Sequence, residues 1–427
     1  SYMTHLNEKS EEINEAIINA GDSSDSFVFV TDTHNVSNEM RSPALIKYLL
    51  SKTLVNKVIH GGDVIGTYNR SSYSANKAGV KKDLEGMFRF VENINPLGKL
   101  LTVRGNHDVC SYGTAATVYG LTNGVVRSMF MDKFNPSKDI VLNEADEAGS
   151  YFYYDNNRSR IRYIVFDTTD TASSSGETIQ GVGNTQMTWI ITQAVNTVPA
   201  GYNLVFVVHI PVVQNAASDS SWTLYGNVRT LCDAIKHKRN GVVINGVTYS
   251  FSTLRADLLM VIGGHTHGDV ETYVDGVLHV STSSDAHVGN SVKYSLFSDS
   301  KFKGKTVGEI SEQLFDVVVI SQENDTISLI RVGDSGYSRV FSLTQRTVAV
   351  GSTIQLPSTG VASWQVSDSD GLIYADTGHT PNIPIPATTR ISISGGGLVT
   401  GLASGEALAC ATMSDGKTRK FYYIYVQ

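Results

Sequence analysis

Five short apolar segments of the sequence are each followed at once by residues that commonly bind metal ions or transfer protons. The five clusters are Asp32-Thr33-His34, Gly62-Asp63, Gly105-Asn106-His107-Asp108, His209 and Gly264-His265-Thr266-His267. Their candidate ligands carry nitrogen or oxygen donors, which suit zinc, manganese or iron better than copper(I) or an iron–sulfur cluster. One Asp-x-His alone would carry little weight, but five clusters in order predict a metal centre.

The spacing within two of the clusters has a direct physical interpretation. In an extended segment residues i and i+2 face the same side, so we expect Asp32 and His34 to hold one cation together. His265 and His267 face one side in the same way, with their backbones roughly 6–7 Å apart. That separation suits two imidazoles that flank a pair of ions about 3.5–4 Å apart.

An α/β layered domain is needed to position these clusters, and the sequence predicts one. Strands are expected at residues 27–30, 57–60, 100–103, 161–166, 204–208 and 258–262, and helices at 5–20, 42–54, 83–93, 185–196 and 227–238. Strands that alternate with helices are typical of the α/β class. Because sites in open α/β sheets form beyond the carboxyl ends of the strands, clusters that span residues 32 to 267 can converge in space.

This ordered set of motifs resembles that of the calcineurin-like metallophosphoesterase superfamily, over residues 27 to 341. The resemblance implies a four-layer α/β/β/α sandwich with a dinuclear metal centre at one edge of the paired sheets. It also implies phosphoester hydrolysis. We therefore expect an enzyme that acts on a phosphomonoester or a small phosphodiester, using a hydroxide that bridges two metal ions for in-line attack on phosphorus.

The resemblance divides seven residues between two divalent or trivalent ions of manganese, zinc or iron. One ion would be held by Asp32, His34 and His267. The second would be held by Asn106, His209 and His265. Asp63 would bridge both ions.

Two residues beside these ligands are expected to act on the leaving group. The resemblance places His107 next to the ions rather than on them, with Asp108 as the partner that orients it. A protonated His107 would donate to the leaving alkoxide or stabilise the charge that develops there. The family often has a second Asp three residues after the bridging one, where this chain has Gly66. We expect that departure to change the support of the site and not its ligands.

His60 and Arg104 lie close to the clusters in the sequence and have plainer interpretations. His60 is part of an apolar strand, so we expect a core histidine that is held by hydrogen bonds. Arg104 either contacts a substrate phosphate or forms an ion pair at the surface.

The composition changes after residue 343. Residues 344–427 have no helical period and many Ser, Thr and Gly, with strands expected at 347–356 and 421–426, and they predict a small all-β sandwich. The segment 397–417 resembles a bacterial Ig-like domain of group 2. That resemblance implies a role in attachment or spacing, contact with the cell envelope or a surface polymer, and an extracellular or envelope-associated location. The expected division is 1–26 helix and linker, 27–343 phosphoesterase domain with a cap-like insertion at about 212–256, and 344–427 Ig-like sandwich.

The composition excludes several other classes of protein. The 34 Lys and Arg against 41 Asp and Glu give a net charge of −7, and no basic run suggests binding to duplex nucleic acid. The longest apolar stretch, residues 204–208, is far too short for a membrane span. Three cysteines are too few for a disulfide framework.

A function of a different class stays open at this point. The chain would then be a non-catalytic bacterial surface or phage-associated binding protein, with a metal centre that is only structural. His107 and Asp108 argue against it, because a structural site needs no proton donor beside a complete set of ligands. An inert centre would hold metal without turning over any phosphoester.

Overall fold

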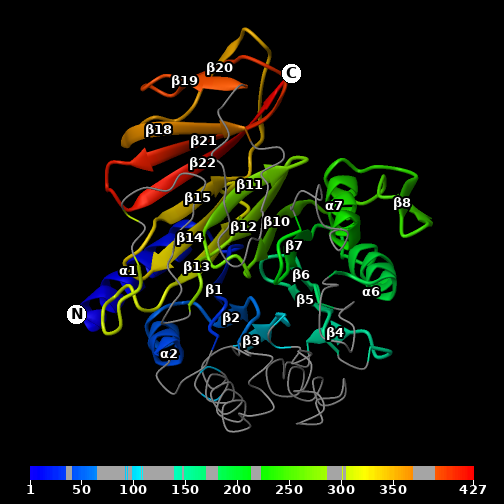
Figure 1. Cartoon of the computed structure of the whole chain (residues 1–427), viewed down its shortest axis with the longest axis horizontal. Helices are drawn as coiled ribbons and strands as arrows, with labels where there is room; N and C mark the ends of the chain where they lie inside the picture. Colours follow the sequence, from blue (N-terminus) through cyan, green and yellow to red (C-terminus); the bar gives the residue numbers. More distant parts are fainter. Residues whose placement is uncertain are drawn as a thin grey trace, which may run out of the picture.

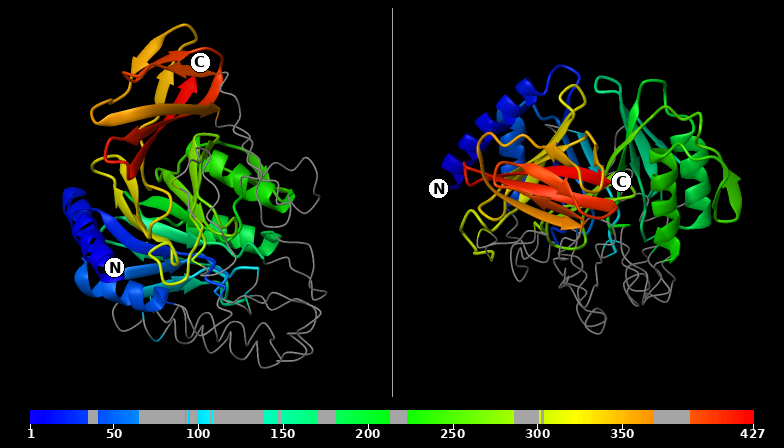
Figure 2. Two further views of the ribbon diagram at one scale, coloured as in Figure 1. Left: turned by 60° about the vertical axis from the view of Figure 1, so that its left-hand side comes forward. Right: turned by 90° about the horizontal axis from the view of Figure 1, so that it is seen from above.

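Two large β-sheets packed face to face form the body of the molecule, and helices cover their outer faces (Figure 1, Figure 2). The computed structural model describes residues 1–34, 41–64, 92, 94, 99–106, 108, 139–146, 149–169, 181–212, 223–285, 301, 304–368 and 390–427. Within these ranges the mixed α/β architecture expected from the sequence is confirmed. The expected helix at 83–93 lies almost entirely outside them.

The first sheet has the strand order β18-β21-β22-β15-β14-β13-β1-β2-β3. Its parallel strands are β1 (Asp25–Val30), β2 (Lys57–His60) and β3 (Lys99–Thr102). On the other side of β1 the antiparallel strands are β13 (Phe315–Ser321), β14 (Thr326–Val332) and β15 (Ser338–Ser342). The three parallel strands carry the first three ligand clusters at their carboxyl ends.

The second sheet has the strand order β11-β12-β10-β7-β6-β5-β4. Its parallel strands are β6 (Ile161–Val165), β7 (Asn203–Val207), β10 (Leu258–Gly263) and β12 (Val277–Ser281). Its antiparallel strands are β4 (Ile140–Leu142), β5 (Phe152–Asn156) and β11 (Val270–Val274). The last two ligand clusters follow β7 and β10.

Alternation along β1 shows how the layers are built. Phe27 and Phe29 are fully buried in the core between the two sheets, where they meet residues such as Tyr163 of β6. Val28 and Val30 point to the other side, toward α1 (Tyr2–Asn19) and α2 (Ser42–Lys52). A strand that is buried on both faces needs a continuous apolar run, and such a run can be recognised in the sequence.

The outer face of the second sheet is covered by a further helical layer, which closes a four-layer arrangement. It consists of α6 (Asn184–Trp189), the π-helix η2 (Ile190–Val195) and α7 (Thr223–Lys236). The single helix expected at 185–196 is therefore an α-helix that continues as a π-helix. In the described part of the expected cap, residues 212 and 223–256, apolar side chains pack into this layer. It includes the hairpin β8 (Val242–Ile244) and β9 (Val247–Tyr249).

Residues 344–427 are all-β where the structure describes them, as expected. The strands are β16 (Arg346–Val348), β17 (Thr353–Gln355), β18 (Val361–Asp368), β19 (Ile391–Ile393), β20 (Leu398–Gly401), β21 (Gly405–Met413) and β22 (Thr418–Val426). The single strand expected at 347–356 is instead two, because the chain turns at Gly351, whose φ is +80°. The Ig-like identity of this region remains an expectation from the sequence.

This C-terminal region continues the first sheet across residue 343. Strand β22 pairs in parallel with β15, from Ser338 opposite Thr418 to Phe341 opposite Phe421. The rings of Phe341 and Phe421 stack with centroids 4.9 Å apart, and Tyr273 of the second sheet stacks on Tyr423 at 4.7 Å. Both C-terminal rings belong to the core between the two sheets. One face of β21 and β22 is therefore packed in this core, while their other face belongs to a separate apolar core of the C-terminal region.

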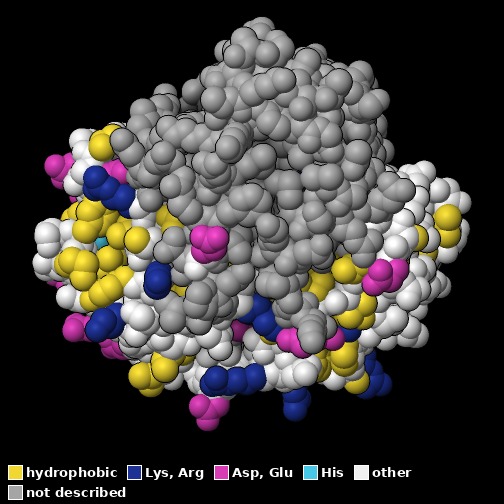
Figure 3. All heavy atoms as spheres, turned by 90° about the horizontal axis from the view of Figure 1, so that it is seen from below, with side chains coloured by type: hydrophobic (Ala, Val, Ile, Leu, Met, Phe, Trp, Pro, Cys, Tyr) yellow, Lys and Arg dark blue, Asp and Glu magenta, His cyan; other side chains and the backbone are white. Residues whose placement is uncertain are grey.

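On the face shown in Figure 3, the described Lys and Arg side chains are scattered among Asp and Glu and form no stripe. Among the helices of the described ranges, none has both the length and the apolar character that a membrane crossing needs.

The shared core predicts that Phe421→Ala destabilises the whole molecule. Removing a fully buried ring typically costs about 3–5 kcal/mol of unfolding free energy, and Phe421 is 0% exposed. Urea unfolding followed by fluorescence and circular dichroism should show one transition that moves to lower urea. Tyr425→Ala, on the same strand but 36% exposed, is the control and should change little. Two transitions, of which F421A moves only one, would contradict a shared core.

Candidate metal centre

The five ligand clusters meet at one edge of the paired sheets and are tied together by backbone hydrogen bonds. The N–H of Asp32 donates to the Gly62 carbonyl (2.9 Å), and the N–H of His34 donates to the Asp63 carbonyl (3.0 Å). In the second sheet, the N–H of Gly264 donates to the His209 carbonyl (2.9 Å). The convergence expected from the strand ends is thus present in the structure.

A first group of candidate ligands consists of Asp32, His34 and His267, all buried. The Nε2 atoms of His34 and His267 lie 2.9 Å apart. Oδ1 of Asp32 lies 3.2 Å from Nε2 of His267 and 3.6 Å from Nε2 of His34. Three donor atoms therefore face one small volume.

A second group consists of Asp63, His209 and His265, together with the amide of Asn106. Oδ1 of Asn106 lies 3.0 Å from Nε2 of His209 and 2.9 Å from Nδ1 of His265. Oδ2 of Asp63 lies 3.2 Å from Nε2 of His209. The same oxygen is 3.7 Å from Nε2 of His34 in the first group. Asp63 is therefore the residue that both groups share.

Five of the seven candidate ligands have a left-handed backbone. Their φ angles are +53° at Asp32, +42° at His34, +54° at Asp63, +68° at His265 and +56° at His267. The extended geometry expected for the Asp-x-His and His-x-His pairs is therefore wrong, although the side chains do converge. Such a conformation costs roughly 1–3 kcal/mol per non-glycine residue, so the surrounding contacts must hold each one in place.

Two glycines let the ligand loops approach one another. A Cβ atom on Gly105 would lie 2.2 Å from both the backbone N and Oδ1 of Asp63. A Cβ atom on Gly264 would lie 2.0 Å from the Thr31 hydroxyl and 2.6 Å from Oδ2 of Asp32. Only glycine fits at either position without moving a candidate ligand.

The Asp108 carboxylate holds two of the loops together. Oδ2 accepts from the N–H groups of Asp63 (2.8 Å) and Gly105 (2.9 Å), and Oδ1 accepts from the N–H of Val64 (2.9 Å). The predicted role of Asp108 as a partner of His107 stays a prediction, because His107 lies outside the described residues. The structure adds a role in positioning Asp63, which the sequence did not reveal.

His60 forms hydrogen bonds to two of the ligand loops. Its Nδ1 accepts from the N–H of Gly62 (3.1 Å), so the ring proton is on Nε2, which donates to the Thr33 hydroxyl (3.2 Å). Burial lowers the pKa of His60 to about 3, so the ring stays neutral. The expectation of a hydrogen-bonded core histidine is confirmed. Its contact with two ligand loops was missed, because only the fold brings Thr33 beside it.

The hydrogen bonds of His209 leave one ring nitrogen directed at the site. Nδ1 donates to the Gly61 carbonyl (2.8 Å), since a carbonyl can only accept. Nε2 is then the atom that faces Asp63 and Asn106. Burial alone would lower the pKa of His209, but the neighbouring Asp63 carboxylate raises it to about 9. The Asp63 carboxylate therefore favours a positive charge near Nε2 of His209, which either a proton or a bound cation can supply.

Asp32 provides a direct sign that these residues fit a metal ion. Its Oδ2 accepts from the Thr31 hydroxyl (2.7 Å) and from the N–H of His265 (2.9 Å). Its Oδ1 is buried and accepts no hydrogen bond from the described residues. Burial alone would raise the pKa of Asp32, but the neighbouring His267 lowers it well below the ordinary value. A charged, unsatisfied oxygen among imidazole nitrogens fits a cation such as zinc, manganese or iron.

Arg104 is engaged in an ion pair. Its guanidinium contacts the carboxylate of Asp167, which is fully buried at the end of β6. Arg104 itself is only 7% exposed, so the pair is buried and not at the surface as expected. Of the two interpretations from the sequence, the structure therefore shows the ion pair.

The comparisons with known proteins point to one family. The sequence matches the family model of calcineurin-like phosphoesterases over residues 26–269, more than half of the chain. This span includes every candidate ligand, from Asp32 to His267. No curated protein matches the chain.

Two solved structures show weak likeness to the chain. One is phosphopantetheinyl hydrolase from Mycobacterium tuberculosis, with 12% identity, a TM-score of 0.30 and coverage of 62% of this chain and 91% of that chain. The other is a conserved uncharacterized protein from Streptococcus pneumoniae, described as a predicted phosphoesterase. It has 10% identity, a TM-score of 0.27 and coverage of 75% of this chain and 98% of that chain.

The close approach at Gly105 predicts that Gly105→Ala weakens metal binding by roughly 10–100-fold, the range typical for residues that orient ligands. The added methyl group would displace Asp63, which both groups share. Competition with a chelator, using Mn²⁺ as the probe, measures the effect. Gly226→Ala is the matched control, because a Cβ there meets nothing within 4 Å. Equal affinities in the two variants would contradict the role given to the Gly105 turn.

Proposed function

Because the chain belongs to the calcineurin-like phosphoesterase family, and is therefore a phosphoric ester hydrolase, we propose that its two ligand groups hold a pair of metal ions that act together on one phosphoester. The observation that carries this proposal is the position of Asp63. Its Oδ2 lies 3.2 Å from an imidazole of the second group and 3.7 Å from an imidazole of the first. A carboxylate in that place is suited to bridge two ions.

The ligand sets follow from the two groups. Asp32, His34 and His267 would hold one ion, and Asn106, His209 and His265 the other, with Asp63 common to both. When bound, two such ions lower the pKa of water toward 7 and stabilise charge on phosphoryl oxygens, which is what attack by hydroxide requires. The hydrogen bond from Nδ1 of His209 to Gly61 keeps its other nitrogen aimed at the site, a common arrangement for a metal-binding histidine.

The charge balance of the ligands favours an anionic substrate. Two divalent ions bring a charge of +4, and the described ligand groups contain only two carboxylates, Asp32 and Asp63. The neutral amide of Asn106 stands where a third carboxylate would cancel more of that charge. The surplus attracts a phosphate group, which supports a phosphomonoester or a small phosphodiester as the substrate.

We assign protonation of the leaving group to His107. Its neighbours Asn106 and Asp108 lie at the site, which supports a place for His107 beside the ions. Proton donation by a positioned side chain typically contributes about 10²–10⁴ in rate.

The C-terminal region contributes no described residue to the two ligand groups.

The proposal predicts turnover that depends on metal. Apo protein should not hydrolyse p-nitrophenyl phosphate or bis-p-nitrophenyl phosphate, and reloading with Mn, Zn or Fe should start the reaction. The faster ester then separates a monoesterase from a diesterase. A protein that carries two ions yet hydrolyses neither ester would favour the alternative, a binding protein with a structural metal centre.

Two substitutions separate metal binding from proton transfer. Asp63→Asn should lose both metal and activity, because the shared carboxylate is gone. His107→Ala should keep its metal and lose roughly 10²–10⁴ in kcat. Metal content by elemental analysis and initial rates on the better ester test both statements. Equal loss of metal in the two variants would refute the division of roles.

A further inference from the structure

The loop that carries His265 and His267 is fastened at its far end by Asp269. The loop leaves the second sheet at the end of β10 and rejoins it at Val270, and both histidines have a left-handed backbone. Oδ1 of Asp269 accepts from the N–H (3.1 Å) and the hydroxyl (2.8 Å) of Ser283. Asp269 is fully buried and lies two residues beyond His267.

The third hydrogen bond to Asp269 comes from the other sheet. Nη2 of Arg331, on β14, donates to Oδ1 of Asp269 at 2.6 Å. Ile327 and Leu329, at alternate positions before Arg331, lie in the core between the sheets, so Arg331 occupies the same face of β14. The ion pair therefore spans the space between the two sheets, next to the metal centre.

Arg331 is itself held by several further hydrogen bonds, one of them from Nη2 to Oδ2 of Asp316 (3.2 Å). Its Nε donates to Oδ1 of Asp316 (2.9 Å) and its Nη1 donates to the Ser335 carbonyl (2.9 Å). Arg339 donates to the same Asp316 (3.1 Å) and to Glu271 (3.2 Å). Each of these four ionisable residues is at most 2% exposed. Three carboxylates, that of Asp269 included, and two guanidinium groups thus form one buried network.

The stability of the fold does not by itself explain why these charged residues are buried. Buried ion pairs add little net stability compared with well-packed apolar residues, because both charges lose their hydration. Their geometry, however, is directional, and the guanidinium of Arg331 joins three chain segments at fixed distances. The network replaces apolar residues of the core at the place where the strained histidine loop must be held.

We propose that Arg331 is a positioning residue of the metal centre, which acts through Asp269 to hold the histidine loop so that His267 meets Asp32 and His34. This inference rests on the metal pair of the proposed function. It concerns a residue of β14 that contacts none of the candidate ligands in the described structure. Its partner Asp269 is 62 positions away in the sequence.

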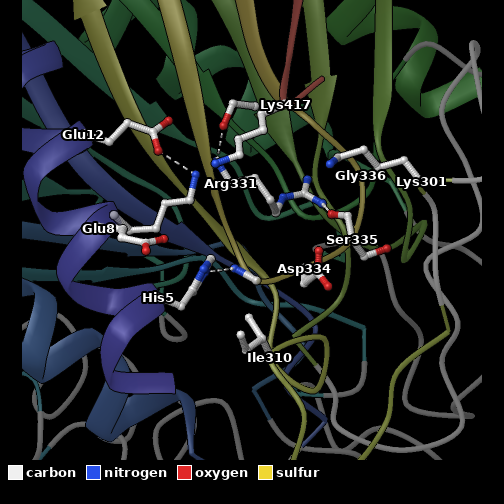
Figure 4. Close-up of a pocket in the computed structure, with 13 residues that line it drawn as sticks. His5, Glu8, Glu12, Lys301, Ile310, Arg331, Asp334, Ser335, Gly336 and Lys417 are labelled. Atoms are coloured by element: carbon white, nitrogen blue, oxygen red, sulfur yellow. Dashed lines mark hydrogen bonds and ion pairs between the residues drawn. The ribbon is translucent and has the colours of Figure 1, made fainter. Parts of the chain in front are cut away.

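The surroundings of Arg331 allow a conservative test. Arg331 lines a cavity of about 270 Å³ between α1 and the turn after β14. Its other lining residues include His5, Ser335 and Lys417 (Figure 4). A lysine side chain is shorter than that of arginine and keeps the positive charge that faces Asp269 and Asp316. We therefore expect Arg331→Lys to fold while losing the fixed, forked contact with Asp269 and Asp316.

The matched control is Arg162→Lys. Arg162 is 3% exposed and donates from Nε and Nη2 to the two oxygens of Asp155, both at 2.7 Å. It also donates to the Ala194 carbonyl (2.8 Å), on the helical layer of the second sheet. The variant removes a forked, part-buried contact at a place that lacks candidate metal ligands in the described structure.

The experiment measures Mn²⁺ affinity by chelator competition, together with the melting temperature, for the full chain. We expect R331K and R162K both to melt earlier, and only R331K to bind Mn²⁺ roughly 10–100-fold more weakly. Asp269→Asn, which keeps an oxygen acceptor for Ser283, should weaken Mn²⁺ binding in the same way and replaces R331K if that variant does not fold. Wild-type affinity in either folded variant, or equal weakening in R162K, would overturn the proposal.

The measurement is independent of catalysis. If the wild-type protein binds two ions but hydrolyses no phosphoester, the proposed function fails, and the effect of R331K on affinity still decides the role of Arg331. If the wild-type protein binds no Mn²⁺ at all, the proposed function and this inference fail together. In that case the cause is the ligand set, which elemental analysis of the wild-type protein shows directly.

Discussion

The backbone of the candidate ligands is the constraint on which the rest of the site depends. Asp32, His34, Asp63, His265 and His267 all adopt a left-handed conformation that non-glycine residues avoid. Five such residues in one site cost several kcal/mol together, so hydrogen bonds between the loops must hold them. The Asp108 carboxylate and the His60 ring both bind the loop of Gly62 and Asp63, and the Asp269–Arg331 pair lies at the end of the histidine loop. The polar groups around the site are thus as necessary to its geometry as the ligands.

The interior of the molecule changes character toward the site. Far from it, the two sheets meet through apolar side chains such as Phe27 and Val205. Near the histidine loop, the same faces of β13, β14 and β15 carry Asp316, Arg331 and Arg339. Apolar packing is not directional and tolerates small shifts, whereas a forked ion pair sets both distance and angle. The change from one to the other occurs where the position of a loop matters most.

The sequence predicted those features that depend on short stretches of chain. The strand at 57–60 was predicted with its observed bounds, because the β-branched residues Val58 and Ile59 stand just before the turn-forming pair Gly61-Gly62. The meeting of the ligand clusters was also predicted, because parallel strands end at a common edge. The left-handed backbone at Asp32 was not, since the groups that bind it, the Gly62 carbonyl and the N–H of His265, are far away in the sequence. Nor was the pairing of β22 with β15, because no local pattern in a β-rich segment identifies its partner strand.

The arrangement of donors explains why the site is better suited to two cations than to none. Nε2 atoms of His34 and His267 lie 2.9 Å apart, and a single proton between them would satisfy one pair of nitrogens only. Oδ1 of Asp32 would still be charged, buried and without a hydrogen bond from the described residues. A cation in the first group satisfies all three donors at once. The same reasoning applies to Asp63 and His209 in the second group, where Asp63 raises the pKa of the imidazole to about 9. Since Oδ2 of Asp63 lies near an imidazole of each group, the carboxylate is within reach of a cation in either one.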